Sequence, residues 1–181
     1  PSAWLYALAA AGAIEDELAR AEAFSEVVPH LPDNLKRKGS LSALAAVRSI
    51  SDERAQARAL SLLVPHFPED LKVKAWRDAL ASARSNQESS RRSRAFLALT
   101  PKLPKELMEE AWLDALRSAR SIANAQARAL ALREIAVLLP DNLTTEAWGE
   151  ALNATGAIEN EIVRVEAFTA LAPDLPNALK I

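Results

Sequence analysis

Apolar residues recur along this chain with the period of an α-helix. At about 100° per residue, Ala43, Leu44 and Val47 fall on one side of a helix. After a short polar break, Ala59 and Leu60 begin a matching stripe on a second helix. Glycine is scarce, and Ala, Leu, Arg and Glu lose little rotamer entropy in a helix, so the composition favours helix throughout.

This pair of helices is one copy of a repeat with a period of 36 residues. The prolines that close the copies are Pro32, Pro68, Pro104, Pro140 and Pro176. A tryptophan column on the same lattice contains Trp4, Trp76, Trp112 and Trp148, with Ser40 in the remaining place. Four further columns, headed by Ala7, Leu8, Ala23 and Leu35, are identical in all five copies. A fixed period without insertions is typical of stacked units that contact only their neighbours.

Each copy predicts a first helix of about 15 residues after its Leu-Pro pair, and a second helix after a short polar break. Asp33 is placed as an N-cap or first-turn acid of a first helix. The residues that we expect to cap the second helices are Asp16, Asp52, Asn124 and Asn160, with Glu88 as a weaker variant. Prolines at 29, 65, 101 and 173 end the second helices. Val137 replaces that proline in one copy, where we expect the helix to run a turn longer.

The pattern therefore predicts an all-α fold, a right-handed α-solenoid of about five helix-turn-helix repeats. Residues 1–181 form a single repeat domain in this interpretation, with seams near the five prolines of the 36-residue lattice. The chain opens on Pro1 and lacks a polar cap at either end, so we expect a fragment of a longer chain, or end-to-end self-association through the uncapped termini.

The repeat resembles the tetratricopeptide (TPR) helical hairpin. The resemblance rests on Trp4, Ala7-Leu8, Ala23-Phe24 and Pro32, and its pattern covers the whole chain. The period of 36 exceeds the roughly 34 of the standard unit, and the usual small Gly and Tyr after the first Leu are absent. The sequence around the seams also resembles that of repeat arrays in large bacterial STAND-type signalling proteins. The resemblance implies that the first helix of each repeat lines a concave, ligand-binding groove.

On that groove face, seven residues are the candidate partner-binding set: Leu41, Arg48, Arg77, Arg84, Leu113, Arg117 and Arg120. An alternative is that the arginines at 48, 84 and 120 complement the dipoles of helix C-termini, a contribution of about 0.3–1 kcal/mol each. A second arginine column, at 20, 92, 128 and 164 with Gln56 as its exception, lies near the packing stripe. We expect its guanidinium groups to pair with nearby glutamates or to bond loop carbonyls.

Little in the sequence indicates catalysis. There is no cysteine, no P-loop and no HExxH pair, so we expect neither an enzyme nor a bound cofactor or metal. His30 and His66 share a column, but Lys102, Leu138 and Asp174 hold it elsewhere, which indicates exposed loop side chains. No apolar run is long enough to cross a membrane and no signal peptide is evident, so a cytoplasmic location is expected.

The distribution of charged residues along the chain indicates which class of partner to expect. Residues 48–133 carry 16 Lys and Arg against 10 Asp and Glu, whereas the flanking segments are net acidic. The leading interpretation is a non-catalytic scaffold or sensor domain that binds a protein or peptide of acidic or mixed charge in its groove. A structural spacer arm of a larger signalling protein is the alternative. Nucleic-acid binding is disfavoured by the net charge of −2 and by the lack of a continuous basic stripe.

Overall fold

A computed structural model describes residues 3–180, apart from the side chains at 141, 142 and 178. The described chain is all-helical and contains no strand. Its ten α-helices are α1 (Ala3–Gly12), α2 (Glu17–Val27), α3 (Asp33–Ser49), α4 (Glu53–Leu63), α5 (Glu69–Ser85), α6 (Ser89–Leu99), α7 (Lys105–Arg120), α8 (Ala125–Ala136), α9 (Asp141–Gly156) and α10 (Glu161–Leu171). The predicted helical class is confirmed.

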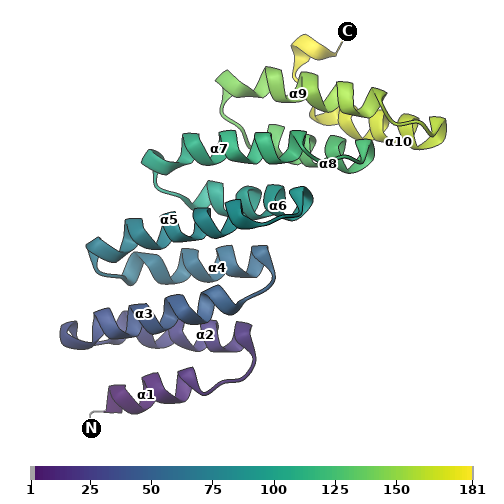
Figure 1. Cartoon of the computed structure of the whole chain (residues 1–181). Helices are drawn as coiled ribbons and strands as arrows, with labels where there is room; N and C mark the ends of the chain where they lie inside the picture. The colour runs from purple at the N-terminus through teal and green to yellow at the C-terminus, as the bar shows by residue number, and fades with distance from the viewer. Residues whose placement is uncertain (1–2, 181) are drawn as a thin grey trace. The chain divides into compact units, whose positions relative to one another are not determined.

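The helices form two compact units. Unit 1 comprises Pro1–Ala83 and unit 2 comprises Arg84–Ile181, so the boundary falls near the end of α5. In unit 1, α2 packs against α1, α3 and α4. In unit 2, α8 packs against α6, α7, α9 and α10. These partners lie one or two places away along the chain, and successive helices of a unit run side by side in alternating directions (Figure 1).

Side-chain caps start the even-numbered helices. The Asp16 carboxylate accepts a hydrogen bond from the backbone N–H of Ala19 at 2.7 Å, and Asp52, Asn124 and Asn160 do the same for α4, α8 and α10. Glu88 occupies the corresponding place before α6 without a capping hydrogen bond from its side chain. A glutamate has one methylene more than Asp, and Asp and Asn are the better N-caps. The predicted caps at Asp16, Asp52, Asn124 and Asn160 are confirmed, whereas Glu88 does not cap α6 through its side chain.

The seams between repeats are short 3₁₀ turns with a proline inside. They span Val28–His30, Val64–His66, Thr100–Lys102 and Ala172–Asp174. A further 3₁₀ turn, Asn177–Leu179, follows the last seam. Where Val137 replaces the proline, α8 runs 12 residues against 11 in the other even-numbered helices. The expectation of a full extra turn was wrong, because the chain bends at 137–139 and Leu139 still enters the core.

Most positions of the tryptophan column and of the invariant column headed by Ala7 lie in the core. Trp76, Trp112 and Trp148 are 6%, 3% and 2% exposed, and Ala43 is fully buried. Trp4 is an exception, at 37% exposed. Phe168 shares a further column with Phe24, Leu60, Phe96 and Leu132, which are all buried. It is 40% exposed, because no described α-helix follows α10 to cover the face that is buried in α2, α4, α6 and α8.

Ser40 occupies the tryptophan column in α3. Leu31 and Leu8 fill the space beside it by packing against the neighbouring Gly39, where an added Cβ would overlap the Leu31 side chain. Ser40 is fully buried, and its hydroxyl has no hydrogen-bond partner among the described residues. A helix without a large residue in this column is therefore accommodated by its neighbours, at the cost of one unsatisfied polar group.

Candidate functional site: an arginine-lined hollow in unit 2

All seven residues of the candidate partner-binding set are exposed, and they lie on odd-numbered helices. Leu41 and Arg48 are on α3 and Arg77 is on α5, all in unit 1. The members in unit 2 are Arg84 on α5 and Leu113, Arg117 and Arg120 on α7. Exposure is what a groove residue needs, and the predicted role in partner binding stays a prediction.

The arginines at the ends of α3, α5 and α7 each reach a carboxylate on the next odd-numbered helix. The pairs are Arg48–Asp78 at 2.5 Å, Arg84–Asp114 at 2.6 Å and Arg120–Glu150 at 2.6 Å. The acids stand on the 36-residue lattice as the arginines do. The repeat therefore encodes an ion pair between neighbouring first helices.

A second carboxylate joins two of these pairs. Glu110 lies 2.6 Å from the Arg84 guanidinium, and Glu146 lies 3.0 Å from that of Arg120. Partial burial acts to lower the pKa of Arg84, but its hydrogen bond to Asp114 and the charges of Asp114 and Glu110 outweigh that effect and raise the pKa. The hydrogen bond to Glu150 is the main cause of the raised pKa of Arg120. Both groups therefore stay cationic and suit the binding of anions rather than proton transfer.

Around Arg84 the chain forms a hollow of about 470 Å³. Its lining consists of Arg84, Arg92, Phe96, Asp114, Arg117, Ser118 and Ser121, all in unit 2. Asp114 stands between two of the arginines: its Oδ2 accepts from Nε of Arg84 at 2.7 Å, and its Oδ1 accepts from Nη1 of Arg117 at 2.5 Å. The Asp114 side chain is 10% exposed, whereas that of Arg117 is 75% exposed. The structure thus brings Arg84 and Arg117 of the candidate set together on one carboxylate.

Arg92 supplies the third guanidinium of this hollow. It donates to the carbonyl of Asn86 at 2.7 Å and to the hydroxyls of Ser118 and Ser121 at 3.2 Å. The other arginines of its column make the same kind of hydrogen bond: those at 20, 128 and 164 donate to the carbonyls of Ile14, Ile122 and Ile158. The expectation that this column bonds loop carbonyls is confirmed, and its main role is to close the turn between two helices.

A related hollow of about 300 Å³ lies one repeat further on. It is lined by Arg120, Arg128, Leu132, Glu150, Asn153 and Ala154, and each of these positions corresponds to one of the first lining after a shift of 36 residues. Asn153 replaces Arg117, so this second hollow has one guanidinium fewer. The arginines of the first hollow are three against the carboxylates of Asp114 and Glu110, whereas those of the second are two against Glu150 and Glu146. The first hollow is therefore the more favourable place for an anionic ligand.

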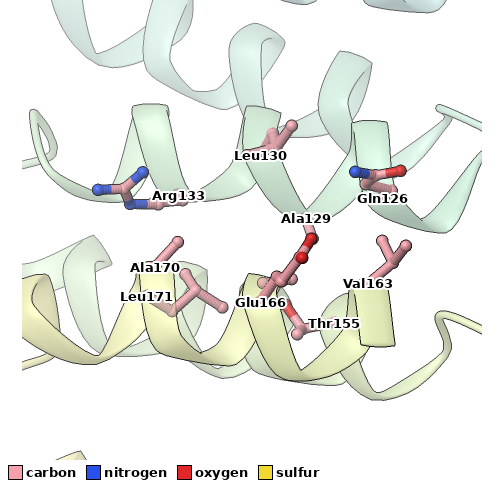
Figure 2. A pocket seen from close by; sticks show the side chains of 10 residues that line it. Gln126, Ala129, Leu130, Arg133, Thr155, Val163, Glu166, Ala170 and Leu171 are labelled. Atoms are coloured by element: carbon pink, nitrogen blue, oxygen red, sulfur yellow. The ribbon is translucent and has the colours of Figure 1, made fainter. Parts of the chain in front are cut away.

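Another hollow, of about 190 Å³, lies between α8 and α10 (Figure 2). Small apolar side chains such as Ala129 and Ala170 form much of its wall, and Leu130 and Val163 face it from the two helices. Two of its polar groups have partners: Arg133 pairs with Asp174 at 2.6 Å, and the Thr155 hydroxyl donates to the carbonyl of Ala151. Gln126 and Glu166 are the other polar residues of the lining.

The sequence analysis missed the acids of this site. Asp114 was not singled out, although an acid recurs with the lattice period in Asp78, Asp114 and Glu150. The recurrence of this acid in three successive copies is the sequence signal that could have identified it as a partner of the arginines. The separation in sequence between each arginine and its acid becomes meaningful only when the packing of successive first helices is known.

Other kinds of site find no support in the described part of the chain. His30 and His66 are exposed, as the sequence indicated, and no cluster of three potential metal-ligating side chains occurs within residues 3–180. Of the helices described, none combines the length and the apolarity needed to cross a membrane.

Comparison with known proteins gives no family for this chain. No protein-family model, no curated protein and no solved structure matches it.

Proposed function

We propose that this chain is a non-catalytic, TPR-like right-handed α-solenoid that binds an acidic segment of a protein partner on its first-helix face. The observation that carries the proposal is the excess of guanidinium groups in the Arg84 hollow, where Arg84, Arg92 and Arg117 stand against two carboxylates: Asp114 in the lining, and Glu110, which pairs with Arg84. Leu113, on the same helix as Arg117, is 44% exposed and offers an apolar contact beside the charges.

Arg117 is the residue most available to such a ligand. A guanidinium has five N–H donors, and Asp114 occupies only one of those of Arg117. Arg84 is 42% exposed at its side chain, although it is held by Asp114 and Glu110. A ligand carboxylate can therefore bond to Arg117 in bidentate fashion without breaking the internal pair, which is the geometry that arginine favours for carboxylates.

Charge reversal at Arg117 tests this function. Titration of a short fluorescein-labelled Glu-rich peptide, followed by fluorescence anisotropy, should show binding that weakens as salt is added. We expect Arg117→Glu to weaken it by about tenfold or more, because a close attraction becomes a repulsion. Arg94→Glu is the matched control, since Arg94 is exposed on α6 with no ion pair among the described residues. Equal losses in the two variants would show that only net charge matters and would refute the hollow as the site.

A spacer arm is the second candidate, and the ion pairs between first helices favour it. Arg48, Arg84 and Arg120 are all engaged within the chain, which stiffens the array and leaves fewer charges for a partner. A spacer predicts no saturable peptide binding in the same titration. Single-stranded RNA bound more tightly than the peptide, and lost in Arg84→Glu and Arg120→Glu, would instead favour nucleic-acid binding. The expected bacterial source and cytoplasmic location stay predictions.

A further inference from the structure

A further hollow of unit 2, distinct from the arginine hollows, is mainly apolar. It has a volume of about 460 Å³ and lies where the start of α7 meets the end of α8. Its lining residues are Pro101, Lys105, Met108, Glu109, Trp112, Leu138, Leu139 and Pro140. Trp112 and Leu139 are 3% and 8% exposed and belong to the core, so they form the inner wall.

Two departures from the repeat converge on this hollow. Met108 stands where α3 and α5 have Lys36 and Lys72, which pair with acids of their own first turns. Leu138 stands in the column that is polar in all four other copies. The two columns belong to different parts of the repeat, one to the first helix and one to the seam after the second. Their joint change to apolar residues makes this place unlike its equivalents elsewhere in the chain, which carry polar residues in both columns.

Folding alone does not account for the change. Leu138 is 49% exposed, the neighbouring Val137 is 55% exposed, and Met108 is half-buried. A polar residue serves at the positions of Met108 and Leu138 in the other repeats. Exposed apolar side chains gathered beside a hollow are typical of a surface that a ligand covers, and the volume is within the range of pockets that bind small groups.

The rim of the hollow offers a basic residue that is new to its column. Lys105 stands where the preceding copies hold Asp33 and Glu69, so the charge at this position is reversed, with Glu106 as the acid of the first turn of α7. Lys105 is exposed and forms no ion pair with any described carboxylate. It is the first residue of a helix that has no side-chain cap, and the helix dipole adds positive potential there. Glu109, one turn further on, also lines the hollow, so an acidic ligand group is expected on the side of Lys105.

We propose that this hollow binds a bulky apolar side chain of a partner peptide, such as Phe, Leu or Trp, whose next residue is acidic and pairs with Lys105. The apolar side chain lies against Trp112, Met108 and Leu138. The site does not depend on the arginine hollow, and binding here is compatible with either outcome of the Arg117 test.

The chain offers its own reporter, because Met108 is its single methionine. Labelling with [¹³C-methyl]methionine gives one NMR methyl signal at the hollow. We expect the blocked tetrapeptide Gly-Phe-Asp-Gly to shift this signal in a saturable manner. The peptide with Ala in place of Phe should give no shift, and the one with Lys in place of Asp should bind about two- to fivefold more weakly, as an exposed ion pair implies.

Leu138→Lys restores the polar residue of the repeat without touching the core, and it should abolish the shift. Leu130→Lys is the control, because Leu130 is exposed to a similar extent, 47%, and lies outside this hollow. The proposal is overturned if the Phe, Leu and Trp peptides all leave the Met108 signal unmoved, or if Leu138→Lys binds them as the unchanged chain does. It is also overturned if the Ala peptide shifts the signal equally.

Discussion

A single carboxylate, that of Asp114, holds two guanidinium groups in the candidate site. Its side chain is nearly buried, and its two oxygens accept from different arginines, Arg84 and Arg117. Hydrogen bonds between charged groups in such partly buried places contribute more than exposed ion pairs do. This residue therefore links the stability of unit 2 to the charge that the hollow presents.

We predict that Asp114→Asn lowers the free energy of unfolding by about 1–2 kcal/mol, because one neutral amide cannot serve both arginines. Asp78→Asn should cost less, under about 1 kcal/mol, since Asp78 is 34% exposed at its side chain and pairs only with Arg48. Urea denaturation measures both. Asp114→Asn should also bind the Glu-rich peptide more tightly, because the internal competitor of the ligand is gone. Unchanged or weaker peptide binding would contradict the proposed site.

Ser40 carries the other residue-scale prediction. Its hydroxyl is fully buried without a partner among the described residues, so removing it relieves a desolvation penalty. We predict that Ser40→Ala raises the free energy of unfolding by about 1 kcal/mol or more. Ser42→Ala on the same helix is the control for helix propensity, and it should gain only about 0.5 kcal/mol. If the two gains are equal, Ser40 is not an unsatisfied group.

At the scale of elements, the even-numbered helices differ mainly in how they start. Four of them are capped by Asp or Asn, and α6 begins after Glu88 with no capping hydrogen bond from that side chain. Glu88 pairs instead with Arg91 on the surface at 2.9 Å. A residue whose side chain caps the helix at position 88 would therefore stabilise the first turn of α6.

We predict that Glu88→Asp raises the free energy of unfolding by about 0.5–1 kcal/mol, because the shorter side chain can accept from the backbone N–H three residues on. Glu88→Ala loses the surface ion pair and gains no cap, so it should be neutral or slightly destabilising. Thermal unfolding followed by circular dichroism compares the three chains. A Glu88→Asp variant no more stable than Glu88→Ala would show that the geometry at this turn excludes a cap.

At the scale of the whole molecule, the 36-residue lattice predicts which deletions the chain tolerates. Removing residues 105–140 joins Pro104 to the start of α9 and keeps the register. Arg84 then faces Glu146 and Glu150 in place of Glu110 and Asp114, one lattice step on. We expect helicity per residue to be retained and the thermal midpoint to fall, because one repeat and one interface are lost.

The matched control removes residues 105–122 only, which takes out α7 and places α8 directly after the seam at Pro104. That chain joins α6 and α8 and lacks α7, on which both of them pack, so we expect it to lose much of its helicity. Circular dichroism at equal concentration distinguishes the two. Similar losses of helicity in both deletions would contradict the solenoid and its independent repeats.

The sequence by itself determined the helices, their caps and most of the core. The reason is local: apolar periodicity, Asp or Asn before a helix and proline after it act over a few residues, and at least four copies repeat each signal. Repetition also showed that His30 and His66 are incidental, since their column tolerates Lys, Leu and Asp. The second arginine column was interpretable for the same reason, because its carbonyl acceptors lie only six residues back.

Only the tertiary structure decided which distant residues meet. The pairing of Arg84 with Asp114, and of Met108 with Leu138 at one hollow, joins positions that are far apart in sequence, and no local rule ranks such pairs. The same holds for Trp4 and Phe168, whose columns predict burial but whose exposure depends on whether a neighbouring helix covers them. The repeat pattern predicts which side chains each repeat buries. The packing of neighbouring helices decides which charged and apolar side chains remain exposed and able to bind a partner.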